Sequence, residues 1–508
     1  MSAEILVESS SRRPRLKLWP LGSLPLSMLI LWVANTGGEA LRWLVLGGFA
    51  SAMVFCLMLS LEAGMIAMIV FEPLRGFLRR AQYLYLTYSA SDPIHIVTPV
   101  VTLVAFAILL QRQRFRLFNQ STLAMLVSVL AAIYFFQIFN PTQGGAAVGL
   151  SGALFVLIPV LWFYFAQVIK PEFMLTAFRL IVVLAFITSL YGLYQLYFGF
   201  PSFEQYWIDN TDFYNSISVG KVERALATFS SAEEWGRYVE LATLIAFGFA
   251  AQAETRIRQA GWAISGAVLS LMLLFTGQRT AMFGLLLGIA VLVVIGAKTR
   301  RAAMARVFML LAPALLIGVL AKAPTNDDML DHGDDERAKA LLSHTARGTL
   351  NPTKEDSLNE RLKNWTYLAT DVIPYHPLGM GLGATSVGAW RYAGSEIDLP
   401  PIDSYFISSI LTCGIPAVLL LIWILCKATA ISWRTYRSAE PNSSEARLWR
   451  IAAAMMPVLI LNNMFGNTFT LYSVAPLGWL LVGWVSTWGL ARRENSDLEV
   501  GEREVIVI

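Results

Sequence analysis

The chain has 508 residues, of which 56% are hydrophobic and 15% are charged, and its formal net charge is +4. A soluble domain carries roughly a quarter charged residues, so this composition excludes an ordinary soluble protein. Binding to nucleic acid would need a basic face on a soluble domain, which is not evident, and no nucleic-acid partner is expected. Apolar residues instead recur in blocks of about 15–20, the length of a helix that crosses a bilayer. The sequence therefore predicts an all-α, polytopic helical membrane protein.

The N-terminal segment, residues 1–20, is basic and contains "SRRPRLK". The apolar stretch that follows has no convincing small-residue cleavage site, which a secretory signal peptide would need. We therefore interpret this segment as the cytoplasmic lead-in to a first membrane span.

About 14 apolar stretches are candidate spans by length. They lie near 21–37, 42–59, 60–74, 93–111, 122–139, 149–168, 175–198, 238–253, 261–276, 280–297, 304–322, 404–427, 451–466 and 474–491. Because several are short, and 42–74 fits either a bent hairpin or one tilted span, we expect about 12–14 transmembrane helices.

Basic stretches such as "QRQRFR", "ETRIR" and "KTRRAAMAR" fall on one face under this count, and the positive-inside rule puts both termini in the cytoplasm. Arg75, Arg79 and Arg80 fall on the opposite face. Either the early spans are miscounted, or these arginines belong to an interfacial helix.

The predicted organisation has five parts. Residues 1–20 are the cytoplasmic N-terminus, and 21–322 hold transmembrane helices with an external loop near 201–235. Residues 323–402 form a large extracytoplasmic loop, 403–491 hold the C-terminal transmembrane helices, and 492–508 are a cytoplasmic tail. A loop as long as 323–402 is unusual unless it serves as a lid or a site.

Two arginines are the first candidates for chemistry. Arg279, in "TGQRTAMFG", lies at the external ends of two apolar runs, and Arg224, in "VERALATF", is also external and precedes a span. A lone arginine in such a place either meets lipid phosphate or marks a functional site. Two of them fit a bidentate clamp for an anionic head group, because guanidinium groups match phosphate oxygens.

Two further residues could carry proton transfer. His376 is a candidate general base, because its unperturbed pKa is near neutrality, but a histidine before proline in a turn is equally often structural. Asp403, in "PPIDSYF", either caps the following helix or contacts substrate. The nearby glycine run "HPLGMGLGA" lacks the context of a nucleotide-binding loop and indicates close backbone packing instead. No metal-binding pattern and no cofactor are indicated.

The segments "RALATF", "TGQRTAMFGLLLGI", "HPLGMGLG" and "DSYFISSILTCGIPAVLLLI" occur in this order. Together, over about residues 224–425, they resemble the O-antigen ligase and O-antigen polymerase family of bacterial membrane glycosyltransferases. The family form "TGSRTA" has serine where this chain has Gln278, while Arg279 is retained. The N-terminal third of the chain agrees only in being multispanning.

The resemblance implies an inner-membrane enzyme with its active site facing the periplasm, acting in O-antigen or exopolysaccharide synthesis. It implies transfer of a glycan from undecaprenyl diphosphate to a glycan or a lipid A-core acceptor, without metal or cofactor. Arg224 and Arg279 would hold the diphosphate, where guanidinium groups stabilise the charge of the departing lipid diphosphate. The lipid bilayer and a chain-length regulator protein are the other expected partners.

One position departs from the ligases that the chain resembles. They carry "HN" where this chain has "IDS", so that Asp403 stands where the histidine thought to activate the acceptor is found. An aspartate can act as general base if it lies within hydrogen-bond reach, with His376 as the fallback. We therefore favour a polymerase over an O-antigen ligase. A flippase or transporter for the same lipid-linked glycan is the alternative of another class.

Overall fold

The computed structural model describes residues 38–89, 92–118, 120–211, 218–219, 222–251, 253–295, 318–319, 337–350, 356–386, 399–440 and 443–489. Helices dominate these residues, and the only strands among them are two-residue β1 and β2, which pair antiparallel. The predicted all-α fold of a multi-pass membrane protein is confirmed. The predicted domain boundaries stay predictions.

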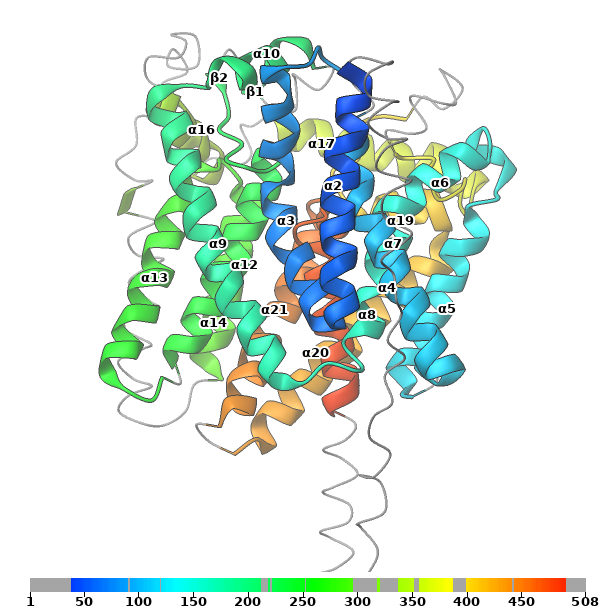
Figure 1. Ribbon diagram of the computed structural model, residues 1–508, viewed down its shortest axis with the longest axis vertical. Coiled ribbons are helices and arrows are strands. Elements are labelled where there is room, and N and C mark those ends of the chain that lie inside the picture. The colour runs from blue at the N-terminus through cyan, green and yellow to red at the C-terminus, as the bar shows by residue number, and fades with distance from the viewer. Residues whose placement is uncertain are drawn as a thin grey trace, which may run out of the picture.

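The main elements form a bundle whose helices run mostly along the vertical direction of Figure 1. In chain order they are α2 (Gly38–Leu59), α3 (Leu61–Ala81), α4 (Val97–Gln113), α5 (Thr122–Gln137), α6 (Ala146–Phe155), α7 (Leu157–Val160), α8 (Trp162–Phe165), α9 (Pro171–Phe198), α10 (Ser202–Asn210), β1 (Ser218–Val219), β2 (Val222–Glu223), α12 (Ala232–Ala251), α13 (Arg256–Phe275), α14 (Arg279–Val294), α16 (Arg337–Leu350), α17 (Asp356–Tyr367), α19 (Tyr405–Cys413), α20 (Ile415–Ser438) and α21 (Ser444–Met464). Residues 475–489 form one more helix.

Short helical turns connect several of these elements. They are η2 (Gln82–Leu84), η3 (Pro93–Ile96), η4 (Arg114–Phe118), η5 (Pro141–Gln143), the π-helical η9 (Leu368–Val372), η10 (Ile373–Tyr375) and η12 (Thr468–Thr470).

Five of the described helices are long and apolar enough to cross a membrane, and the pair α6 and α7–α8, bent by 41°, can form a sixth span. The predicted spans near 21–37 and 304–322 lie wholly or mostly outside the described residues. The predicted number of 12–14 spans therefore stays a prediction.

The helix bounds differ from two of the predicted spans. The stretch expected as one span at 404–427 contains two helices, α19 and α20. Gly414, at φ 85°, interrupts the helical backbone between them. The helix that contains the stretch expected as a span at 238–253 is α12, which begins earlier, at Ala232. Its first turns carry Glu233, Glu234 and Arg237, which lower the local hydropathy although the backbone is helical.

The segment 42–74 is a hairpin of two helices, α2 and α3, with Ser60 capping the second by accepting from the Ala63 amide. The arginines that fell on the unexpected face lie at the end of α3. Arg80 is 1% exposed, lies 2.7 Å from the Glu204 carboxylate and donates to the Phe229 carbonyl. Acidic groups and carbonyls at the same end thus satisfy this charge, and α3 need not be an interfacial helix.

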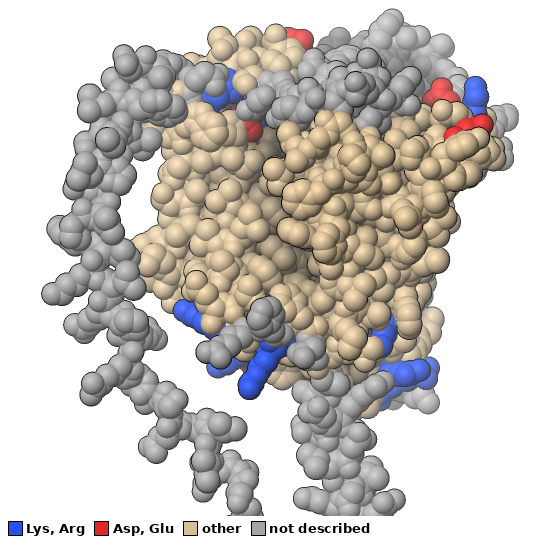
Figure 2. All heavy atoms as spheres, turned by 90° about the vertical axis from the view of Figure 1, so that its right-hand side faces the viewer, with Lys and Arg blue, Asp and Glu red and all other residues tan. Residues whose placement is uncertain are grey.

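The two ends of the bundle differ in charge. One end, called here the upper end, carries α10, β1, β2, α16 and α17 (Figure 1). On the face shown in Figure 2, Lys and Arg gather at the opposite, lower end, and the wide band between the ends is uncharged. The apolar band has the character of a membrane-facing surface.

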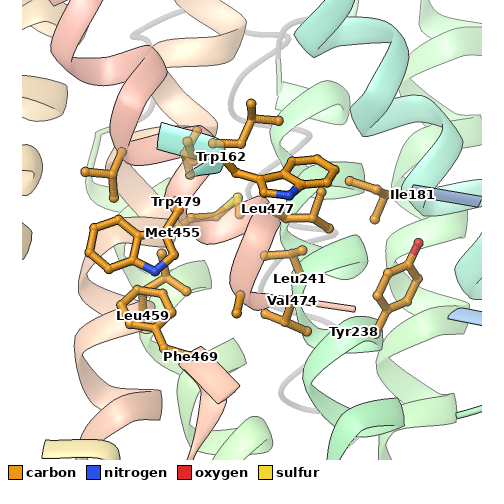
Figure 3. Close-up of a cluster of buried hydrophobic side chains, with 14 of the residues drawn as sticks. Trp162, Ile181, Tyr238, Leu241, Met455, Leu459, Phe469, Val474, Leu477 and Trp479 are labelled. Carbon is orange, nitrogen blue, oxygen red and sulfur yellow. The ribbon is translucent and has the colours of Figure 1, made fainter. Parts of the chain in front are cut away.

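A continuous hydrophobic core joins α12, α21 and the C-terminal helix. Figure 3 shows Tyr238 and Leu241 of α12 near Val474, with Met455, Leu459 and Trp479 in the same cluster. Phe469 and Trp479 stack with ring centroids 5.1 Å apart. This packing fixes the upper turns of α12 and α21, which carry Arg237, Glu240 and Asn462.

Candidate functional site

Arg279 occupies the first position of α14, after the three-residue turn Thr276–Gly277–Gln278 that follows α13. Gly277 adopts φ 67°, a left-handed conformation that a residue without Cβ adopts without strain. The N-terminus of a helix carries partial positive charge, so an arginine there adds to a positive potential. An anion is the ligand that such a place favours.

Arg224 directly follows β2 and is half-buried. Burial lowers the pKa of Arg224 below its usual value; the guanidinium of Arg279 lowers it further, Glu233 raises it, and Arg361 lowers it again. The structure therefore brings Arg224, Arg279 and Arg361 into one electrostatic neighbourhood, although more than 130 residues separate the first from the last in sequence.

Arg361 lies on α17 and links this neighbourhood to Asp403. Its Nε donates to Asp403 Oδ2 at 2.9 Å, and the two side chains are 36% and 46% exposed. The site thus combines three guanidinium groups with a carboxylate that remains accessible. Sequence reasoning missed Arg361; its only signal was a position in the long external segment.

Asp403 is not the cap of α19, contrary to one of the two roles considered for it. Ser404 is the N-cap, and its hydroxyl accepts from the Ile407 amide. The Asn467 side chain holds the preceding residue by donating to the Ile402 carbonyl at 2.7 Å. The Asp403 carboxylate is therefore not needed to cap α19 and can contact a substrate.

His376 ends η10, and its backbone makes the turn contacts, with the Gly379 amide donating to the His376 carbonyl. Among the described residues, no hydrogen bond or ion pair links its side chain to Asp403 or to the three arginines. The role of His376 as the fallback base stays a prediction.

The glycines after His376 allow close backbone packing, as the sequence indicated. Gly379 has φ 90°, and a Cβ there would lie 2.6 Å from the Thr412 carbonyl oxygen. The Met380 amide donates to the Leu411 carbonyl at 2.7 Å. This segment therefore packs against the end of α19.

A buried polar network lies beneath the site. Arg237 of α12, 1% exposed, donates to Thr280 Oγ1 at 2.8 Å and to Asn462 Oδ1. Asn462 in turn donates to Glu240 Oε2 at 2.8 Å. Because Thr280 follows Arg279, this network ties the first turn of α14 to α12 and α21.

The network also approaches the Asp403 side of the site through Gly466. The Tyr405 amide, at the start of α19, donates to the Gly466 carbonyl at 3.0 Å. A Cβ at Gly466 would lie 2.6 Å from Arg237 Nη2 and 2.7 Å from Glu233 Oε1. Glu233 and Arg237 were not predicted, and their signal was charge at the start of an otherwise apolar helix.

The fold and this cluster define a multi-pass helical membrane protein with a cationic site and an accessible carboxylate near the upper end of its helices. Residues 264–422 match the family model described as O-antigen ligase. The match, which covers about a third of the chain, supports the O-antigen ligase and polymerase family that the resemblance implied. The same match supports a membrane enzyme of the type that acts in surface polysaccharide synthesis.

The matched segment contains Arg279, Arg361, His376 and Asp403, whereas Arg224 lies before it. No curated protein matches the chain.

Proposed function

We propose that the protein is a glycosyltransferase that takes an oligosaccharide from undecaprenyl diphosphate and joins it to an acceptor glycan. The observation that carries this proposal is the gathering of Arg224, Arg279 and Arg361 beside Asp403. A diphosphate is the anion that several convergent guanidinium groups suit best. The accessible carboxylate beside them supplies a general base.

The reaction follows from these roles. Arg224 and Arg279 bind the diphosphate, and Asp403 accepts the proton of the acceptor hydroxyl as its oxygen forms a bond to the anomeric carbon. The bond between that carbon and the diphosphate oxygen breaks, and its electron pair stays on the diphosphate. The guanidinium groups stabilise this developing charge in a site partly withdrawn from water. No step uses a metal.

The charges support an orientation. Basic residues occur at several helix ends: Arg258 near the start of α13, Arg437 near the end of α20, and Lys170 just before α9. On the face shown in Figure 2, Lys and Arg gather at the lower end. By the positive-inside rule this end faces the cytoplasm, so the site faces the opposite side, the periplasm of a bacterial inner membrane. The protein would then bind its lipid-linked sugar donor outside the cytoplasm.

We favour polymerisation over ligation to lipid A-core, because this chain has an aspartate at position 403 where ligases of the family carry a histidine. A flippase is less well supported. Charged residues do lie within a span, at Arg237 and Glu240, but the cavity beside them is about 10 Å³. That volume holds about one water molecule, not a saccharide.

Deletion of the gene, followed by profiling of undecaprenyl-linked saccharides in the membrane, tests the proposal. Single repeat units accumulating on the lipid are the expected result of a missing polymerase. Long polymers stranded on the lipid would identify a ligase instead. If the lipid-linked saccharides do not change, the proposed reaction is wrong.

A further inference from the structure

A polar hollow lies at the lower end of the bundle, away from the candidate site at the upper end. Its volume is about 330 Å³, at the small end of the range typical of ligand sites. It is lined by Arg179, Phe249, Glu254, Arg258, Trp262 and Arg447, which come from α9, α12, α13, α21 and the turn between α12 and α13. Four helices thus enclose it.

The lining is cationic, and two of its arginines pair with its glutamate. Three arginines face one glutamate, which gives a net charge of +2. The Glu254 carboxylate accepts from Arg258 Nη1 at 2.8 Å and from Arg447 Nη2 at 3.2 Å. Each guanidinium has five N–H donors, and this pairing uses one from each. Arg447 is only 15% exposed in its side chain, and its buried Nε has no hydrogen-bond partner.

The depth of the hollow matches the boundary of a membrane. Glu254 lies in the turn just before α13, and Trp262 lies six residues after the start of that helix, about 9 Å along its axis. The rings of Trp262 and Phe249 pack with centroids 4.9 Å apart and form an apolar wall. Tryptophan is typical of the level of lipid headgroups.

We propose that this hollow binds the headgroup of an anionic phospholipid in the leaflet at the lower end. The phosphate would accept from the arginines, and the glycerol and first acyl carbons would pack on the Trp262–Phe249 wall. A free phosphate would satisfy the arginines but leave the apolar wall without an occupant, so we favour the lipid. Basic pockets between transmembrane helices are known to suit anionic headgroups. This proposal does not depend on the proposed function.

The test measures thermal unfolding of the purified full chain in detergent with added phosphatidylglycerol, phosphatidylcholine or inorganic phosphate. We expect phosphatidylglycerol to raise Tm and the other two to leave it nearly unchanged. Native mass spectrometry then counts retained phosphatidylglycerol in wild type, in Arg179→Gln/Arg258→Gln and in Arg434→Gln/Arg437→Gln. The first pair lines the hollow through exposed side chains, and the second pair is exposed on α20 at the same end, outside it.

We expect the first double variant to retain at least fivefold less phosphatidylglycerol than wild type, and the second to match wild type. Equal stabilisation by phosphatidylcholine, or equal loss in both double variants, would overturn the proposal, because binding would then be general to the surface. Equal stabilisation by inorganic phosphate would assign the hollow to a free anion and not to a lipid. The absence of any stabilisation by phosphatidylglycerol would also overturn it.

Discussion

Arg361 holds Asp403 through a single contact, its Nε donating to the carboxylate Oδ2 at 2.9 Å. The contact joins α17 to the residue that precedes the cap of α19. Because Asp403 remains 46% exposed, an acceptor hydroxyl can still reach its carboxylate. Arg361 therefore has two proposed roles, as part of the positive neighbourhood of Arg224 and as the residue that orients the base.

Removing the orienting arginine should slow the reaction while the protein still folds. For Arg361→Ala we expect a loss in kcat of about 100-fold, the scale associated with a misplaced catalytic group. The measurement is the rate at which membrane vesicles consume the lipid-linked donor. Lys363→Ala, an exposed change on the same helix, is the matched control. If both variants keep wild-type rates, Arg361 does not orient the base.

The choice between the two candidate bases can be made with one pair of variants. Asp403→Asn should lower kcat by about 10²–10⁴-fold, the usual contribution of general base catalysis, and leave binding of the donor intact. His376→Ala should have a much smaller effect, because no hydrogen bond or ion pair among the described residues joins its side chain to the cluster. The reverse pattern would assign proton transfer to His376, and two active variants would leave neither residue as the base.

The diphosphate clamp predicts that Arg224→Ala and Arg279→Ala each abolish activity without lowering the amount of protein. Removing one preorganised donor costs about 10²–10³-fold in comparable sites. Lysine at either position should restore only part of the rate, since it lacks the planar fork. Arg437→Ala, exposed at the lower end, serves as the control in membranes with equal protein levels. Full activity in either arginine variant removes the clamp.

The sequence predicted the class of fold and two of the three gathered arginines. Arg279 is conspicuous because it lies between two apolar runs, and Arg224 because it is external and precedes a span. It did not predict Arg361, which sits in a polar segment where charge is ordinary and acquires meaning only through its contact with Asp403. The role of Arg237 could not be predicted from the sequence for a related reason. Its partners, Thr280 and Asn462, lie on two other helices, and no local pattern encodes that packing.

Helix breaks were equally hard to predict. The break at Gly414 depends on Pro377, whose carbonyl accepts from the Ile415 amide, and on Leu378, whose Cα would lie 2.6 Å from a Cβ at position 414. From sequence alone, an apolar run with one glycine is interpreted as a continuous span. The segment that packs against the glycine, here Pro377 and Leu378, becomes apparent only in the structure.

The buried network predicts a difference between two glycine substitutions in helices. A Cβ at Gly284 in α14 would lie 1.9 Å from Glu240 Oε1, whereas one at Gly261 in α13 would meet nothing within 4 Å. Gly261→Ala should be neutral or stabilise by up to about 1 kcal/mol through helix propensity. Gly284→Ala should destabilise by about 1–3 kcal/mol, as overpacking does. Thermal unfolding of the two purified variants gives the comparison.

Gly284→Ala should also lower activity beyond its effect on stability. Glu240 is bonded through Asn462 to Arg237, which holds Thr280 beside Arg279, so displacement of its carboxylate is transmitted to the diphosphate site. The activity of folded protein, measured well below the unfolding temperature, separates this effect from simple loss of protein. A variant as stable and active as Gly261→Ala would mean that Glu240 moves aside at little cost. Arg279 would then keep its position without the network beneath it.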